Sequence, residues 1–280
     1  MTLIIGMIYK EGLILIGDTK ISGGADEAYD NKIVAPVAGL NVAVGSAGFT
    51  QLAKDFNLKI YHLVQQRLAE YRLANIRDLS GTGTSINDIE SGKMKGIILP
   101  WTYKGFNFLD DCATLTKQLA ETGKIYIDNP IESLVAMFLP SSPEILESDF
   151  TLYQIDCNGF RVEVPYASIG SGTDHIGDYL RRNYYKDISL KEAILLGTFL
   201  IKYVEILEFD KNVGLEKGKL PQIFLIKKDY FKNYEPNITE KSEILDEVKK
   251  RIGKIRSSML LFNSKGKRVD KPVWGGSKVS

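Results

Sequence analysis

Hydrophobic residues at the start of the chain form two pairs of short runs, each pair separated by a break. Residues 3–9 and 13–17 are apolar and rich in β-branched side chains, with Lys10, Glu11 and Gly12 between them. Residues 33–37 and 41–44 repeat the arrangement. We expect two β-hairpins, because a turn between two β-forming runs is typical of that motif. Both faces of these strands are apolar, which predicts two sheets packed face to face and covered by helices.

The period of the hydrophobic positions changes after Gly48. Leu52, Phe56 and Ile60 recur at helical spacing and the pattern continues to about residue 73, so a long amphipathic helix is predicted. A later helix is expected to begin at Ser189, whose hydroxyl and Glu192 have the spacing of a capping box. Further helices are predicted at residues 109–122 and 174–184, and strands at 134–139, 151–156, 160–164 and 221–226.

Two segments depart from this regular pattern. Residues 75–107 contain a Gly/Ser/Thr-rich stretch and then Trp101, and we interpret them as an insertion or lid of mixed structure. Residues 227–280 carry an excess of seven positive charges and a helical pattern at about 240–255. The sequence therefore predicts a domain at residues 1–226 with an insertion. A basic C-terminal extension follows, which we expect to be solvated or to bind a regulatory partner.

Composition narrows the possible functions. The chain has 280 residues, is 44% hydrophobic and has a formal net charge of +1, which argues against nucleic acid or a membrane surface as the main partner. Its two cysteines and two histidines are isolated, so we expect no metal site, no cofactor and no disulfide framework. The longest apolar run, residues 193–207, is broken by Lys202 and Glu205 and is too short to span a bilayer. Since no secretory signal is visible, a cytoplasmic location is expected.

Three segments, in their order along the chain, resemble subunits of the proteasome β type. The first comprises residues 2–6 and 17–20, and the second joins residues 32–33 to residues 45–48. The third comprises residues 166–172 and 187–193, then Asp210 and Gly214. The resemblance covers most of residues 2–226 and excludes the insertion and the tail. It implies an α+β fold in the form of a four-layer αββα sandwich, the chemistry of an N-terminal nucleophile hydrolase, and usually stacked rings of subunits.

The resemblance makes Thr2 the nucleophile. A threonine hydroxyl is weak and needs a base, which in this family is the residue's own α-amine, with an ordinary pKa of about 8. Thr2 must then be the first residue of the mature chain. Met1 precedes it, and methionine removal is efficient before a small residue such as threonine. We therefore expect Thr2 to attack a peptide carbonyl after Met1 is removed.

The same resemblance assigns roles to three residues around Thr2. Lys32 would lower the pKa of the Thr2 hydroxyl through its positive charge. Asp18 would pair with Lys32, because an unpaired buried charge costs several kcal/mol. Gly45 would donate its backbone N–H to the oxyanion that forms during the attack.

The match also implies a supporting layer and a substrate groove. Ser171 and Asp210 correspond to residues that orient the α-amine and relay protons. The family usually has a serine three residues after that aspartate, where this chain has Val213, which cannot donate or accept a side-chain hydrogen bond. The groove positions correspond to Ile21, Ser22, Ala43 and Ala47, and the two small alanines would leave room for a bulky substrate side chain.

The expected activity is that of a threonine-type endopeptidase, which cleaves a polypeptide substrate through an acyl-enzyme on Thr2. Two alternatives on the same scaffold stay open. One is a transpeptidase or protein ligase, in which an amine resolves the acyl-enzyme, and the other is a catalytically weak structural ring subunit. A third alternative is a binding module that recruits partners through the basic tail. The resemblance also implies assembly with like subunits, as a homo-oligomer or ring.

Overall fold

In a computed structural model, the chain divides into two compact units, Met1–Glu235 and Pro236–Ser280. The first unit contains both large sheets and the second contains a single described helix. The structure describes residues 2–21, 28–35, 42–79, 108–124, 130–138, 150–206, 213–227 and 231–259.

The first sheet joins the N-terminal hairpin to the last strands of the unit. Its order is β10-β1-β2-β11-β12, and all neighbouring strands run antiparallel. The predicted first hairpin is confirmed, because Tyr9 pairs with Gly12 across a turn formed by Lys10 and Glu11. The strands are β1 (Ile4–Tyr9), β2 (Gly12–Gly17), β10 (Tyr166–Ile169), β11 (Gln222–Lys227) and β12 (Phe231–Asn233).

The second sheet has the order β5-β6-β7-β8-β9 and is also antiparallel. The predicted second hairpin corresponds to the β5–β6 pair, in which Ile33 lies opposite Gly45; its turn lies outside the described residues. A separate two-stranded sheet pairs β3 (Lys20–Ile21) with β4 (Ala28–Tyr29). The strands of the second sheet are β5 (Ile33–Val34), β6 (Val42–Gly48), β7 (Ile131–Phe138), β8 (Phe150–Ile155) and β9 (Arg161–Glu163).

The two large sheets pack face to face, and successive side chains of each strand point to opposite faces. Ile4, Leu15 and Ala43 belong to the apolar cluster between the sheets. Val42 and Val44 belong instead to the cluster that packs against the helices on the outer side of the second sheet. Because both faces of β6 are covered, the strand reads as a continuous apolar run rather than an alternating one.

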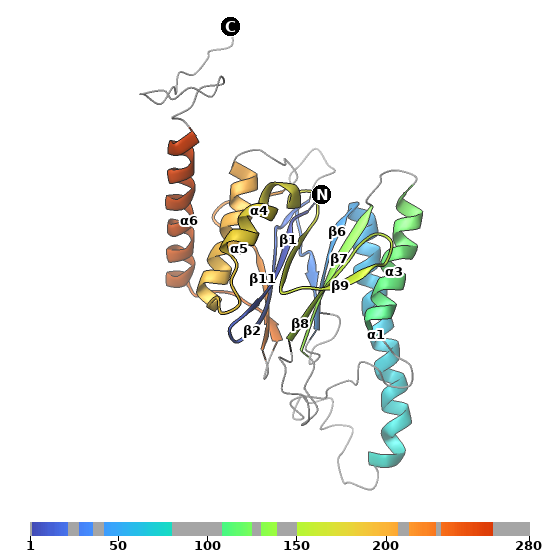
Figure 1. Cartoon of the computed structure of the whole chain (residues 1–280). Coiled ribbons are helices and arrows are strands. Elements are labelled where there is room, and N and C mark those ends of the chain that lie inside the picture. Colours follow the sequence, from blue (N-terminus) through green and yellow to red (C-terminus); the bar gives the residue numbers. More distant parts are fainter. Residues whose placement is uncertain are drawn as a thin grey trace. The chain divides into compact units, whose positions relative to one another are not determined.

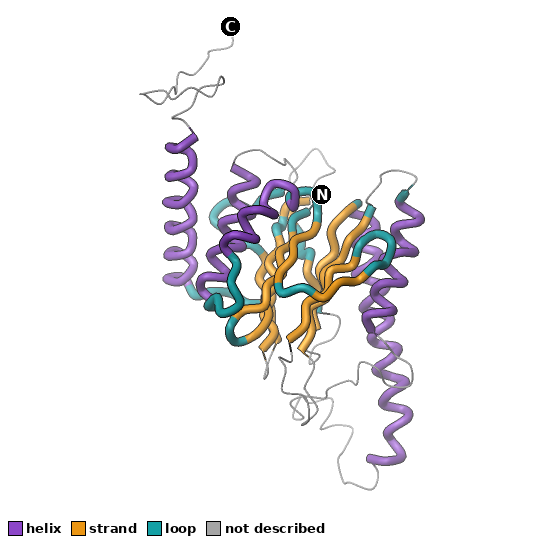
Figure 2. Tube along the Cα trace, in the orientation of Figure 1, coloured by secondary structure: helices purple, strands orange, loops and turns teal. Residues whose placement is uncertain are grey.

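Helices cover the outer faces and complete a four-layer sandwich, as Figures 1 and 2 show. α1 (Thr50–Leu79) and α3 (Phe108–Gly123) cover the second sheet, whereas α4 (Thr173–Asn183) and α5 (Leu190–Ile206) cover the first. The predicted α+β class and αββα layering are therefore confirmed. α1 includes residues 75–79 of the predicted insertion, and residues 80–107 lie outside the described part of the chain.

The start of α5 is fixed by the predicted capping box. The Ser189 N–H donates to Glu192 Oε2 at 3.1 Å, and the Glu192 N–H donates to Ser189 Oγ at 3.3 Å. These two reciprocal bonds satisfy backbone donors that have no partner within the first turn of a helix. The prediction from the Ser189–Glu192 spacing is confirmed.

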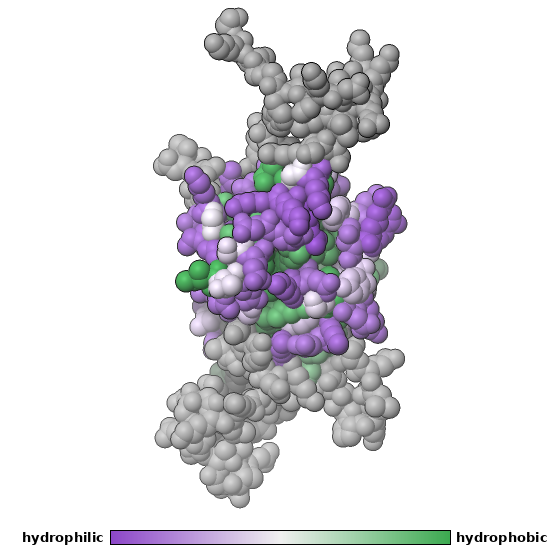
Figure 3. All heavy atoms as spheres, turned by 90° about the vertical axis from the view of Figure 1, so that its left-hand side faces the viewer, coloured by the Kyte–Doolittle hydropathy of each residue, from purple (hydrophilic) through white to green (hydrophobic). Residues whose placement is uncertain are grey.

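The second unit contains α6 (Ile238–Met259), which confirms the predicted helix at 240–255 and extends it at both ends. The division between the units falls after Glu235, because β12 pairs with β11 and continues the first sheet beyond residue 226. None of the described helices is long and apolar enough to cross a membrane. The face of the molecule in Figure 3 is largely hydrophilic, as expected when most apolar side chains lie inside.

Candidate active site

Asp18 lies directly after β2 and is held against the start of β1. The Leu3 N–H donates to Asp18 Oδ1 at 2.7 Å, and the Asp18 N–H donates to the Leu3 carbonyl oxygen at 3.0 Å. Asp18 is completely buried. Two hydrogen bonds to the residue after Thr2 therefore fix the carboxylate at the N-terminal end of the first hairpin.

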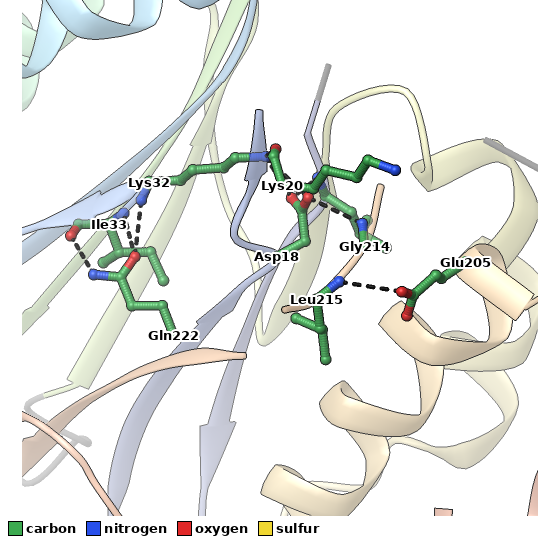
Figure 4. Close-up of polar contacts among 9 residues, drawn as sticks. Asp18, Lys20, Lys32, Ile33, Glu205, Gly214, Leu215 and Gln222 are labelled. Carbon is green, nitrogen blue, oxygen red and sulfur yellow. Dashed lines mark hydrogen bonds and ion pairs between the residues drawn. The ribbon is translucent and has the colours of Figure 1, made fainter. Parts of the chain in front are cut away.

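Lys32 forms a buried ion pair with Asp18 (Figure 4). Its Nζ lies 2.9 Å from both carboxylate oxygens and also donates to the Lys20 carbonyl oxygen. The Gly214 N–H donates to Asp18 Oδ2 at 3.3 Å, so the carboxylate accepts bonds from three different segments. Lys32 and Asp18, which the family resemblance pairs, are in contact in the structure.

Burial is the main influence on the ionisation of Asp18. It raises the pKa of the Asp18 carboxyl, while the charge of Lys32 and the N–H groups of Leu3 and Gly214 act in the opposite direction. Removing either partner of such a pair leaves an uncompensated buried charge, which is strongly destabilising. Asp18 and Lys32 therefore depend on each other for their charged forms.

Gln222, the first residue of β11, positions the backbone around Lys32. Its Oε1 accepts the N–H groups of Lys32 at 2.8 Å and of Ile33 at 2.9 Å. Its Nε2 donates to the Ile33 carbonyl oxygen at 2.8 Å. No role for Gln222 was expected from the sequence. A polar residue that opens an otherwise apolar strand was the signal for it.

Thr2 lies at the edge of a small cavity that it shares with Lys32. The Thr2 residue is 6% exposed, and the cavity has a volume of about 40 Å³. Thr2 and Lys32 therefore belong to one concave site. The cavity is lined by Thr2, Lys20, Asp30, Asn31, Lys32, Ser46, Gly48, Thr50, Ala53, Lys54 and Asn57.

The turn after β10 packs tightly against Thr2. Gly170 has a φ of +97°, and a Cβ added there would lie 2.0 Å from the Thr2 carbonyl oxygen. Only glycine fits both the backbone conformation and the space. The Gly170 N–H donates to Glu132 Oε2 at 3.2 Å, so this turn also contacts the second sheet. Ser171 follows directly and is half-buried.

The structure places Gly45 and the two predicted groove alanines away from the cavity. Gly45 lies in the middle of β6, opposite Ile33 on one side and Leu134 on the other. Ala43 and Ala47 belong to the apolar cluster between the sheets. None of these three residues lines the cavity.

Gly48 and Ser46 line the cavity in their place. The Ser46 N–H faces β5, where the Lys32 carbonyl oxygen lies 3.5 Å away, and the Phe49 N–H donates to the Pro130 carbonyl oxygen at 2.8 Å on the opposite side. Since successive amides of a strand face opposite edges, the Gly48 N–H faces the same side as that of Ser46. Thr2 and Gly48 both line the cavity.

The remaining predicted site residues are described only in part. Val213 is buried, and its Cγ2 lies 3.3 Å from the position of a Cβ added at Gly172, the residue after Ser171. Ile21 belongs to β3, but its side chain is not described. Asp210 and Ser22 lie outside the described residues.

The described part of the chain contains no group of three or more His, Cys, Asp and Glu residues that could hold a metal ion. Both cysteines, Cys112 and Cys157, are buried and neither forms a disulfide. Burial raises the pKa of the Cys112 thiol well above its ordinary value, which keeps it protonated and unreactive.

A comparison with protein families gives one match. The model of the family described as proteasome subunit matches residues 145–209, which include β8, β9, β10, α4 and α5. Among curated proteins, none matches the chain. The matched segment contributes strands to both sheets and both helices on the outer side of the first sheet. The chain is thus similar to proteasome subunits over residues 145–209, and its αββα layering is compatible with a proteasome-like sandwich.

Proposed function

We propose that the protein is a threonine-type peptidase of the proteasome β type, in which the hydroxyl of Thr2 attacks a peptide carbonyl once Met1 has been removed. The observation that supports this best is the buried Lys32–Asp18 ion pair, whose lysine lines the same cavity as Thr2. Apolar residues of similar size would stabilise an interior at least as well as an ion pair. A buried pair beside a hydroxyl in a concave site is therefore better explained by chemistry than by stability.

The base is the α-amine that Met1 removal creates on Thr2. An α-amine has an ordinary pKa of about 8, so a substantial fraction is neutral at physiological pH and can accept the hydroxyl proton. Thr2 Oγ then forms a bond to the substrate carbonyl carbon, and the carbonyl oxygen becomes an oxyanion. The ammonium of Lys32 favours the deprotonated hydroxyl through its charge.

The Gly48 amide is the proposed oxyanion donor. Gly48 lines the cavity that Thr2 also lines, whereas Gly45, which the resemblance suggested, lies within the sheet. A backbone N–H aimed at the developing charge stabilises the tetrahedral intermediate without reorganising. The φ of +141° at Gly48 is a conformation that favours glycine.

Collapse of the intermediate completes the first half of the reaction. The carbon–nitrogen bond breaks, the protonated α-amine of Thr2 returns its proton to the leaving amine, and the substrate acyl group stays on Thr2 Oγ as an ester. Water, deprotonated by the same amine, then hydrolyses the ester. Ser171 and Asp210 are proposed to orient the amine; Val213 cannot assist them, because it offers no hydrogen-bonding group.

The same proposal includes assembly. Proteasome subunits generally form rings with other subunits, and we propose that this chain assembles with its own copies. Native mass spectrometry of the purified protein tests this directly. A single species at the mass of one chain across the micromolar range would rule out a stable homo-oligomer.

The catalytic proposal is tested by intact-mass spectrometry with a threonine-reactive β-lactone or epoxyketone. The expected result is loss of the Met1 mass, one adduct per chain, and a modified peptide that begins at Thr2. Thr2→Ala should abolish the adduct. Thr122→Ala removes the same hydroxyl from an exposed position on α3 and should leave labelling unchanged. Active protein that keeps Met1 would contradict the mechanism.

Hydrolysis and transfer are separated in the same preparation. A cleavable peptide is incubated with an excess of a second peptide that has a free amino terminus, and the products are weighed. Hydrolysed fragments support the peptidase. Products that are mainly spliced would assign the protein to the alternative, a transpeptidase or ligase.

A further inference from the structure

Glu132 is the one charged residue of β7. The other residues of this strand are buried, and Glu132 is half-buried. It lies opposite Ala47 of β6, in the second sheet. A carboxylate that is partly removed from water needs hydrogen-bond donors in place of the water that it loses. The position of Glu132 therefore requires a donor close to its carboxylate.

The donor comes from the first sheet. The Gly170 N–H donates to Glu132 Oε2 at 3.2 Å, and Gly170 directly follows β10. This hydrogen bond therefore crosses from one large sheet to the other, and Figure 1 shows the two sheets facing each other. A charged acceptor forms a stronger hydrogen bond than a neutral one. Glu132 thus holds the start of the turn that leads from β10 to α4.

That turn packs against the backbone of Thr2. A Cβ added at Gly170 would lie 2.0 Å from the Thr2 carbonyl oxygen and 3.1 Å from Ala47 Cβ. Gly170 is therefore close both to the residue that carries the nucleophile and to the residue opposite Glu132. A shift of this turn would move the Thr2 backbone, because no free space separates them.

The other end of the turn is packed against apolar side chains. A Cβ added at Gly172 would lie 3.2 Å from Leu3 Cβ and 3.3 Å from Val213 Cγ2. The resemblance to proteasome subunits leads us to expect a serine where this chain has Val213, whose side chain has no hydrogen-bonding group. Val213 therefore contributes packing but no polar link to the turn, whereas Glu132 contributes a polar link from the second sheet.

The residues at both ends of this link precede groups with a proposed part in the reaction. Ala47, opposite Glu132, precedes Gly48, the proposed donor to the oxyanion. Gly170 precedes Ser171, which is proposed to orient the α-amine. The link therefore joins the segment that stabilises the oxyanion to the segment that orients the base.

We propose that Glu132 is a positioning residue for the reaction at Thr2. Its hydrogen bond to Gly170 keeps the turn after β10 at a fixed distance from β6, the strand that carries Gly48. The proposal rests on the proposed function of Thr2 as the nucleophile. Loss of the acceptor should slow the attack, whereas loss of the charge alone should have a smaller effect, because a neutral amide oxygen still accepts the hydrogen bond.

Two variants separate the acceptor from the charge. Glu132→Gln keeps the side-chain length and an acceptor oxygen, and Glu132→Met keeps the length without the acceptor. The rate of adduct formation on the full chain is measured by intact-mass spectrometry against the concentration of a peptide epoxyketone. Glu132→Met should lower the rate at saturating probe about tenfold, because misplaced reacting groups slow the chemical step. The probe concentration for half that rate should change by less than about threefold, since binding is retained.

Glu132→Gln should bring the saturating rate back to within about threefold of the natural protein. A merely structural role would lower the unfolding free energy and leave the saturating rate of folded protein unchanged. A saturating rate in Glu132→Gln that is as low as in Glu132→Met would overturn the assignment to the hydrogen bond.

Glu163→Met is the matched control. Glu163 lies on β9 of the same sheet, and its Oε2 accepts a hydrogen bond from the Tyr153 hydroxyl at 3.0 Å. The variant thus loses one carboxylate acceptor at an exposed strand position and should keep the natural saturating rate. Equal slowing in Glu163→Met and Glu132→Met would overturn the positioning role.

Amide hydrogen exchange at Gly170, followed by NMR, tests the link without any reaction at Thr2. The Gly170 amide should exchange about tenfold faster in Glu132→Met than in the natural protein and in Glu132→Gln. Unchanged exchange would overturn the proposal whatever the labelling shows. If the natural protein is labelled at Thr2 and Glu132→Met reaches the same saturating rate, the positioning role alone fails. If the natural protein is not labelled at Thr2, the proposed function fails, and the positioning role fails with it.

Discussion

Gln222 and Ile33 are joined by two hydrogen bonds across the gap between the sheets. The Ile33 N–H donates to Gln222 Oε1 at 2.9 Å, and Gln222 Nε2 donates to the Ile33 carbonyl oxygen at 2.8 Å. Gln222 opens β11 in the first sheet, and Ile33 opens β5 in the second. Lys32 directly precedes Ile33, and the Lys32 N–H also donates to Gln222 Oε1. The Gln222 side chain therefore fixes the position of the Lys32 backbone.

Replacing Gln222 by methionine should therefore affect both stability and the site. The change keeps the length of the side chain and leaves the N–H groups of Lys32 and Ile33 without their acceptor. Each buried group that loses its partner costs about 1–3 kcal/mol, so we expect the free energy of unfolding in urea to fall by about 3 kcal/mol. Labelling of Thr2 in protein that is still folded should slow by about tenfold, because a displaced lysine charge stabilises the attacking oxygen less well.

Gln154→Met is the matched control for that variant. Gln154 is a half-buried glutamine on β8, where it lies opposite Leu134 of β7 and Val162 of β9. We expect its unfolding free energy to change by less than about 1 kcal/mol. Equal losses of unfolding free energy in the two variants would mean that the hydrogen bonds of Gln222 have no special role.

The Asp18–Lys32 pair should behave as one unit. Asp18→Asn and Lys32→Met are each expected to slow Thr2 labelling by at least roughly a hundredfold, the usual effect of removing a positioned charged group. The double variant should be no slower than the worse single variant, because the second change removes a group that has already lost its function. Labelling rates by mass spectrometry measure this coupling. Two small effects that multiply in the double variant would show that the residues act independently.

The raised pKa of Asp18 gives a prediction for stability against pH. A carboxyl group with a raised pKa in the folded state binds its proton more tightly when folded, so folding is favoured at low pH. This contribution is fully present below the ordinary value of 3.8 and is lost as the pH rises through the raised pKa. The difference in unfolding free energy between the natural protein and the Asp18→Asn, Lys32→Met variant should accordingly fall with rising pH in that interval. A difference that grows with pH would show that Lys32 outweighs burial and lowers the pKa.

Much of the fold could be predicted from the sequence because local patterns determine it. The apolar runs of the first hairpin, the helical spacing of Leu52, Phe56 and Ile60, and the Ser189–Glu192 pair all involve residues close in the chain. The short strand β12 was missed. Its residues, Phe231–Asn233, form a run too short to show a period, and they become a strand only by pairing with β11.

The site was predictable where the resemblance to proteasome subunits reaches it. A buried lysine needs a carboxylate, and the resemblance gave Asp18 as the partner of Lys32. The role of Gln222 was not predictable, because it depends on two sheets meeting at residues 190 positions apart in the chain. The lining of the cavity depends on which face of a strand each residue occupies. In β6 a shift of one residue exchanges the two faces of the strand, so Ala43 and Ala47 point between the sheets and Ser46 points to α1.

Gly45 and Gly48 are the two candidate donors to the oxyanion, and substituting each by alanine distinguishes them. A Cβ at Gly48 would lie 2.1 Å from the Pro130 carbonyl oxygen, and the φ of +141° is unfavourable for alanine. Gly48→Ala should therefore lower the unfolding free energy by at least about 2 kcal/mol. It should also slow labelling of folded protein by about a hundredfold, because the displaced N–H no longer points at the oxyanion.

Gly45→Ala should be milder. A Cβ there would lie 3.1 Å from two methyl carbons of Ile4, which can shift by the few tenths of an ångström required. We expect a loss of about 1 kcal/mol in unfolding free energy and a labelling rate within about threefold of the natural protein, since the Gly45 amide lies within the sheet. Both variants are compared by urea unfolding and by the initial rate of adduct formation. If Gly45→Ala abolished labelling while Gly48→Ala kept it, the oxyanion donor would be Gly45, as the sequence resemblance suggests, and the Gly48 assignment would be wrong.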